Sequence, residues 1–129
     1  MKKIILVLLV ITLALSLFSC SSSTFNNAVT QLEELYWQST SLYTNEQIAQ
    51  IESSFDEFGL SLTGEIESIA HFIKPQYPES IWVYVYEFEN ESDAISFKKS
   101  YADSWGNAKI SGSVVVYSND SEIINDIQF

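Results

Sequence analysis

Hydrophobic residues recur every three or four positions in several stretches of the chain, which is the spacing of one helical face. The first predicted helix begins at a cap by Asn26 or Asn27 and ends near Thr40. A second is marked by a capping box at 44–47 and by Gly59 at its end. A third follows a cap at Asn90. Its apolar face is predicted to contain Ala94, Phe97, Tyr101 and Trp105. A short last helix is predicted to start at Asn119-x-x-Glu122.

Three stretches between these helices have the patterns of strands. Residues 60–73 alternate between apolar and polar side chains, which predicts a half-buried strand. Residues 81–88 are apolar on both sides except at Glu87, which is typical of a central strand. Residues 109–117 form the third predicted strand.

The predicted order of elements, ααββαβα, defines a small α+β domain. It contains a three-stranded, mainly antiparallel sheet with helices packed on it. If strand 109–117 pairs beside strand 60–73, the sheet resembles a ferredoxin-like sheet that lacks its first strand. If it pairs beside strand 81–88, the sheet is mixed. We favour the first arrangement.

The first residues have the pattern of an export signal. Met1-Lys2-Lys3 is a short positive segment, and an uncharged, mostly aliphatic run extends from Ile4 to Phe18. A helix that spans a bilayer needs about 20 apolar residues, so this run fits a signal peptide better than a permanent anchor. We therefore predict a signal peptide at 1–19, a tether at 20–25 and one α+β domain at 26–129.

The end of this run, Leu17-Phe18-Ser19-Cys20, resembles the lipobox of bacterial lipoproteins: an aliphatic residue, a small residue and an obligatory cysteine. Phe18 is larger than the residue usual at its position. The resemblance covers residues 1–20 and implies a diacylglyceryl group on Cys20, with fatty acyl chains that hold the protein to the membrane. It also implies an exported protein, anchored at the outer face of the cytoplasmic membrane or in the outer membrane.

The charge of the chain excludes one large class of partners. It has 17 acidic residues against six basic ones, all of them lysines, for a net charge of −11. Nucleic-acid binding needs clustered basic residues that release counterions from phosphates, so we predict no nucleic-acid partner. The expected partners are the membrane, through the lipid, and an envelope protein or a glycan.

Residues for catalysis or metal binding are few. Cys20 is the only cysteine and His71 the only histidine, and no nucleophile motif or phosphate-binding glycine loop is present. The alternating carboxylates Glu87, Glu89, Glu91 and Asp93 lack the glycine and the closing glutamate of an EF-hand loop. We predict no catalytic residues, no metal site and no cofactor.

An aromatic row is the feature most suggestive of a binding face. Trp82, Tyr84, Tyr86 and Phe88 alternate along one strand and therefore share one face. We expect helices to cover this row as core, with Trp82 the most accessible member, because an uncovered stripe would promote aggregation.

The sequence thus predicts a non-catalytic envelope lipoprotein that binds a partner or supports an assembly. One alternative is a glycan- or peptide-binding module that uses the face of Trp82, Tyr84, Tyr86 and Phe88. The other is a small hydrolase or metal-dependent enzyme whose carboxylates, such as Glu33, Glu65 and Glu87, gather from distant segments.

Overall fold

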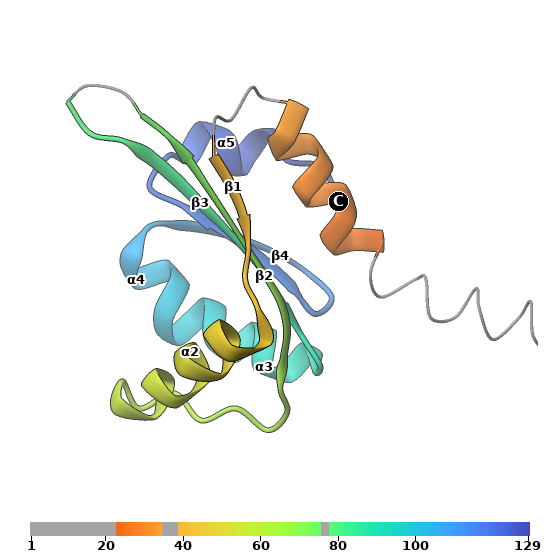
Figure 1. The fold of residues 1–129 in the computed structure, drawn as a ribbon, viewed down its shortest axis with the longest axis vertical. Coiled ribbons are helices and arrows are strands. Elements are labelled where there is room, and N and C mark those ends of the chain that lie inside the picture. Colours follow the sequence, from red (N-terminus) through yellow and green to blue (C-terminus); the bar gives the residue numbers. More distant parts are fainter. Residues whose placement is uncertain (1–22, 35–38, 76–77) are drawn as a thin grey trace, which may run out of the picture.

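An antiparallel sheet forms the middle of the fold, in a computed structural model that describes residues 23–34, 39–75 and 78–129 (Figure 1). Within these ranges the sheet has five strands in the order β1-β2-β3-β5-β4, and each neighbouring pair is antiparallel. The strands are β1 (Ser39–Leu42), β2 (Ile66–Lys74), β3 (Ile81–Phe88), β4 (Asn107–Ser111) and β5 (Val114–Ser118).

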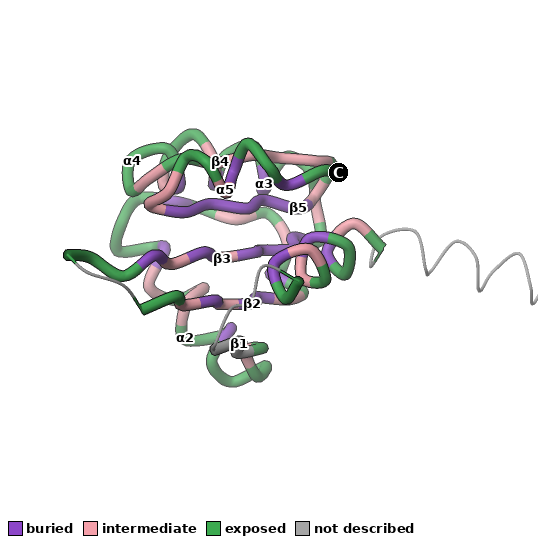
Figure 2. The backbone as a smooth tube through the Cα atoms, turned by 90° about the horizontal axis from the view of Figure 1, so that it is seen from above, coloured by how far each residue is buried: buried purple, intermediate pink, exposed green. Residues whose placement is uncertain are grey.

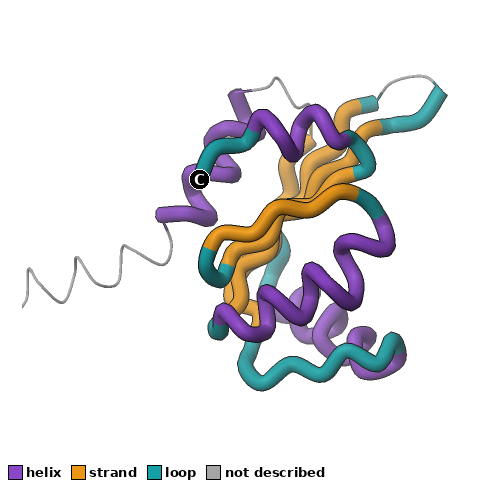
Figure 3. Tube along the Cα trace, turned by 180° about the vertical axis from the view of Figure 1, so that it is seen from behind, coloured by secondary structure: helices purple, strands orange, loops and turns teal. Residues whose placement is uncertain are grey.

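Helices cover both faces of this sheet, as Figure 3 shows from behind. A helix at 23–34 and α5 (Ser121–Asp126) pack on one face. The other face carries α2 (Asn45–Glu57) and a helical segment after β3. That segment runs without a break through α3 (Glu91–Phe97), the π-helical turn η1 (Lys98–Ala102) and α4 (Asp103–Trp105). The predicted α+β class, with an antiparallel sheet and packed helices, is confirmed.

Two separate apolar layers result, because the side chains of each strand point alternately to the two faces. The layer under helix 23–34 and α5 includes Phe25, Leu32, Phe72, Val83, Val85, Val116 and Ile127. The layer under α2 and α3 includes Ile48, Phe55, Ile69, Tyr86, Phe88, Phe97 and Tyr117. β3 and β5 lie between the layers and are buried along most of their length (Figure 2).

The capping signals of α2 predicted it closely. Thr44 Oγ1 accepts a hydrogen bond from the Gln47 backbone N–H, and Gln47 Oε1 accepts one from the Thr44 N–H. After the helix, Gly59 adopts a φ of 75°, which a residue with a side chain rarely takes. The capping box and the terminating glycine therefore act as the sequence indicated.

The predicted third strand is wrong as a single element. Residues 107–118 form a hairpin, β4 and β5, that reverses at Gly112-Ser113. Gly112 has a φ of 56°, the left-handed region that tight hairpin turns require at their first central residue. The reversal brings β5 beside β3, antiparallel to it. The favoured pairing beside strand 60–73 is therefore also wrong, and β1 and β4 are the additional strands.

The predicted strand 60–73 forms only in its second half. β2 begins at Ile66, because the backbone before it is held by a side chain instead of by a strand partner. The buried Asp93 carboxylate accepts hydrogen bonds from the N–H groups of Thr63 and Gly64, at 2.9 and 2.8 Å. Residues 60–65 consequently form a loop across the start of α3.

The ends of the first and last predicted helices also differ from expectation. The first helix is already formed at residue 23 and buries Phe25, while Ser39 and Thr40 belong to β1. The last helix is capped by Asp120, whose side chain accepts from the Glu122 N–H. Asn119 instead joins two strands: its side chain accepts from the Trp82 N–H and donates to the Ser80 carbonyl.

Candidate functional site

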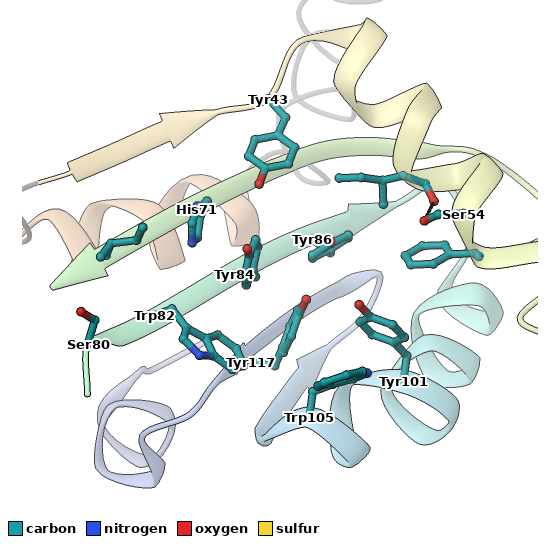
Figure 4. Close-up of a pocket in the computed structure, with 13 residues that line it drawn as sticks. Tyr43, Ser54, His71, Ser80, Trp82, Tyr84, Tyr86, Tyr101, Trp105 and Tyr117 are labelled. Atoms are coloured by element: carbon teal, nitrogen blue, oxygen red, sulfur yellow. Dashed lines mark hydrogen bonds between the residues drawn. The ribbon is translucent and has the colours of Figure 1, made fainter. Parts of the chain in front are cut away.

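Three rings stand side by side in the middle of the sheet face that carries α2. His71 of β2, Tyr84 of β3 and Tyr117 of β5 occupy paired positions on adjacent strands. The His71 and Tyr84 rings stack at 4.2 Å with planes 7° apart, and Tyr84 and Tyr117 stack at 5.2 Å and 16°. Both faces of the Tyr84 ring are therefore covered. The three stacked rings point their edges, and the two tyrosines their hydroxyl groups, away from the sheet (Figure 4).

The predicted aromatic row lies on this same face but divides into two parts. Tyr86 and Phe88 are buried under α3, where their rings lie 4.7 and 5.1 Å from that of Phe97. Trp82 and Tyr84 are only half-buried and line an open cleft. The row is thus core at one end of β3 and cleft floor at the other.

The cleft has a volume of about 600 Å³. Its floor comes from the sheet, and its walls come from α2 on one side and from η1 and α4 on the other (Figure 4). The side chains that line it are Tyr43, Ile51, Ser54, Phe55, His71, Ile73, Ser80, Trp82, Tyr84, Tyr86, Tyr101, Trp105 and Tyr117.

The buried position predicted for Trp105, which lines the cleft, is wrong. Regular helical spacing puts it on the buried face with Phe97, yet Phe97 is fully buried and Trp105 is 61% exposed. The π-helical turn η1 lies between the two residues and changes the angular phase of everything after it. As a result, Tyr101 is half-buried and Trp105 lies at the rim of the cleft.

The residue after Trp105 fixes where this segment meets the sheet. A Cβ atom on Gly106 would collide with the Ser118 carbonyl oxygen of β5, so the backbone can approach this closely only without a side chain. A glycine directly after a run of helical spacing is a common helix end, which is a local signal. The close contact of Gly106 with β5 depends on the tertiary fold.

The cleft is electrically neutral. No Asp, Glu, Lys or Arg side chain lines it among the described residues. Burial lowers the pKa of His71 below 6.5, so the imidazole is mostly uncharged at neutral pH. Burial, then the neighbouring Tyr43, raises the pKa of Tyr84 to about 12, and burial also raises the pKa values of Tyr86, Tyr101 and Tyr117. Tyr84, Tyr86, Tyr101 and Tyr117 therefore keep their hydroxyl protons at neutral pH.

The carboxylates that the sequence analysis considered for a metal or catalytic site lie outside the cleft. Asp93 and Glu89 accept backbone N–H groups of the 60–65 loop, and Glu87 is buried in β3. Glu33 and Glu65 are both exposed, on helix 23–34 and just before β2. In the described ranges, no three His, Cys, Asp or Glu side chains come together in a way that could hold a metal ion.

Cys20, the predicted lipid attachment site, lies outside the described residues, as does the predicted signal peptide at 1–19. Within 23–34, 39–75 and 78–129, no helix combines the length and the hydrophobicity needed to cross a membrane.

The fold and the site together define an α+β domain with helices on both sheet faces and an uncharged, mostly aromatic cleft. Comparison with protein families, with curated proteins and with solved structures gives no match to this chain.

Proposed function

We propose that this protein is a non-catalytic cell-envelope lipoprotein whose domain binds a ligand in the aromatic cleft. The observation that carries the proposal is the cleft itself: about 600 Å³, lined by uncharged aromatic side chains and bordered by an exposed tryptophan. Concave, mostly apolar sites with a few polar groups are where proteins commonly bind ligands. The lipobox-like Leu17–Cys20 supports export and a lipid anchor.

Binding rather than catalysis is supported by how the polar groups of the cleft are engaged. The ring of His71 is stacked on Tyr84, and among the described residues no serine hydroxyl forms a hydrogen bond with it. Ser54 donates its hydroxyl hydrogen to the Ile51 carbonyl at 2.7 Å. A nucleophile needs a base within hydrogen-bonding reach, and this arrangement does not provide one.

The exposed tryptophan makes the proposal testable without disturbing the core. Full-length protein, purified in detergent, would be mixed with bacterial envelope fragments from which the membrane lipids have been extracted, so that the lipid anchor has no bilayer to enter, and sedimented. We expect saturable co-sedimentation of the wild type and loss of most of it for Trp105→Ala, since buried aromatic contacts dominate binding energies. Ile95→Ala is the matched control, because Ile95 is also an exposed apolar residue of the same helical segment and does not line the cleft.

Two outcomes would contradict a binding role for the cleft. One is equal sedimentation of wild type and Trp105→Ala, and the other is no sedimentation of any of the three proteins. Melting temperatures of all three, measured in the same detergent, separate a loss of binding from a loss of folding.

A further inference from the structure

The class of ligand can be inferred from which chemical groups of the cleft remain free. This step rests on the proposed function and concerns the same cleft. The rings of the floor pack mostly against one another, because His71, Tyr84 and Tyr117 form a stack in which their flat faces are in contact. The floor thus offers hydroxyl groups and ring edges, and it offers little flat aromatic surface.

Flat aromatic surface is available instead from two tryptophans. Trp82 is half-buried and meets Tyr84 and Tyr117 in edge-type contacts, with interplanar angles of 60° and 74°. Trp105 has one ring neighbour in the described chain, Tyr101 at 6.1 Å, and is 61% exposed. These indoles come from β3 and α4, so they border the cleft from different elements.

The hydrogen-bonding groups of the cleft belong mostly to hydroxyls. Those of Tyr84 and Tyr43 are hydrogen-bonded to each other, as are those of Tyr86 and Tyr117. Because a hydroxyl both donates and accepts, each such pair keeps one O–H donor and acceptor lone pairs for a ligand. The hydroxyls come from tyrosines of the floor and walls and from Ser54 and Ser80, with the two indole N–H groups as further donors. Because none of the described residues in the lining carries a charged side chain, a charged ligand would lose its hydration without gaining a counter-charge. The cleft therefore matches an uncharged ligand that is rich in hydroxyl groups and has flat apolar faces.

A peptide strand fits this surface less well. The floor is formed by β2, β3 and β5, whose backbone groups are already paired within the sheet. Among the described residues that line the cleft, none belongs to the edge strands β1 and β4. An extended peptide could not add to the sheet there, so its N–H groups would depend on side-chain hydroxyls alone. Proline-rich peptides, which lack most N–H groups, are the peptide class to compare.

We infer that the cleft binds an uncharged saccharide, with sugar rings packed on Trp82 and Trp105 and sugar hydroxyls bonded to the tyrosine hydroxyls. Sugar rings carry apolar C–H faces and a rim of hydroxyls, which are the two features that the cleft complements. The inference names the ligand class, and the broader proposal of a binding cleft does not depend on it.

The test uses full-length protein in a detergent without a sugar headgroup, and four probes. The N-acetylglucosamine tetramer and the glucose tetramer are uncharged saccharides, the galacturonate tetramer is an anionic one, and decaproline represents proline-rich peptides. Titration calorimetry and tryptophan fluorescence report binding. We expect saturable binding of at least one uncharged tetramer, with a change in tryptophan emission, and no binding of the galacturonate tetramer.

Matched variants locate the binding. Trp105→Ala should weaken saccharide binding about tenfold or more, whereas Phe58→Ala should leave it unchanged. Phe58 is a suitable control because it is 64% exposed, close to the value for Trp105, and does not line the cleft. Unchanged melting temperatures for both variants would show that neither effect comes from unfolding.

The contrary results are distinct. Binding of decaproline or of galacturonate in place of the uncharged tetramers would overturn the saccharide inference and leave a binding cleft. Failure of all four probes, or equal saccharide binding by Trp105→Ala and wild type, would also overturn it. If the saccharide test fails but envelope fragments still retain the wild type and not Trp105→Ala, the proposed binding function stands. If the fragments do not distinguish the two proteins either, both the saccharide inference and the proposed function are wrong.

Discussion

The imidazole of His71 and the phenol ring of Tyr84 lie parallel, 4.2 Å apart, as a cross-strand pair of β2 and β3. This contact buries the only histidine of the chain against an aromatic face at the floor of the cleft. Burial disfavours the charged imidazolium, which is why the pKa of His71 lies below the usual 6.5.

The His71 stack gives the first prediction. NMR titration of the His71 ring protons should give a midpoint below pH 6.5, and Tyr84→Ala should move it back toward that value by exposing the ring. Because the unfolded chain binds this proton more readily, the contribution of His71 to stability falls as the pH drops through 6.5. A wild-type midpoint at or above 6.5 would contradict the stacked, buried arrangement.

Phe55 tests the packing of α2 on the sheet. It is 2% exposed, and its ring lies 5.5 Å from those of both Phe97 and Tyr101. Phe55→Ala should cost about 3–5 kcal/mol through the cavity it leaves. The total free energy of unfolding of such a domain is about 5–15 kcal/mol, so the midpoint of urea unfolding should fall markedly. Phe58→Ala, on the same helix end but exposed, should change the free energy of unfolding little.

Asp93 tests the loop that interrupts the predicted strand. Burial alone would raise its pKa, but the hydrogen bonds from Thr63 and Gly64 outweigh burial and lower it below 3.8. Asp93→Ala leaves these backbone donors unpaired and should cost about 1.5–3 kcal/mol, the range for hydrogen bonds to a charged group.

The sign of the pH dependence of Asp93 follows from its lowered pKa. Its contribution is complete above the unfolded pKa and is lost as the pH falls through the folded one. The difference in unfolding free energy between wild type and Asp93→Ala should therefore shrink below about pH 3.8. A difference that stays constant down to pH 2 would show that the carboxylate charge has no part in holding the loop.

The contribution of Glu87 to stability should have the opposite pH dependence. Glu87 is 4% exposed, and burial, then the neighbouring carboxylate of Glu67, raises its pKa to about 7. The folded chain thus holds this proton more tightly than the unfolded chain, so its stability falls as the pH rises from about 4.5 to 7. Glu87→Gln should remove that fall and should be more stable than wild type at pH 8. Parallel slopes for the two proteins between pH 5 and 8 would contradict the raised pKa.

The lipid anchor is tested at Cys20. Because the sulfur of Cys20 is the proposed attachment point, Cys20→Ser should abolish labelling by a radioactive or clickable fatty acid. The variant should also leave the membrane fraction or stay unprocessed. Equal labelling of wild type and Cys20→Ser would contradict the lipoprotein proposal. It would have no bearing on ligand binding in the cleft.

Local signals explain which parts of the fold could be predicted. The capping box at Thr44 and Gln47 and the apolar run of β3 depend on residues close together in sequence, and both appear where expected. The reversal at Gly112-Ser113 was missed because apolar residues continue beyond it to Tyr117. A glycine inside a predicted strand was the available signal for that turn.

The candidate site was predicted only in part, since it depends on contacts between distant segments. The shared face of Trp82 and Tyr84 follows from strand alternation, so sequence alone finds it. The stack with His71 requires the register of β2 on β3. Trp105 reaches the rim through the π-helical turn η1, and helical spacing assumes a regular helix throughout.

The cleft and helix 23–34 lie on opposite faces of the sheet. Helix 23–34 packs beside α5 on the sheet face opposite the cleft, so the described part of the domain begins on the other side of the sheet from the ligand site (Figure 1). In the proposed lipoprotein, attachment and capture would therefore not compete for space, and a copy held at the membrane could fill and empty its cleft while it stays anchored.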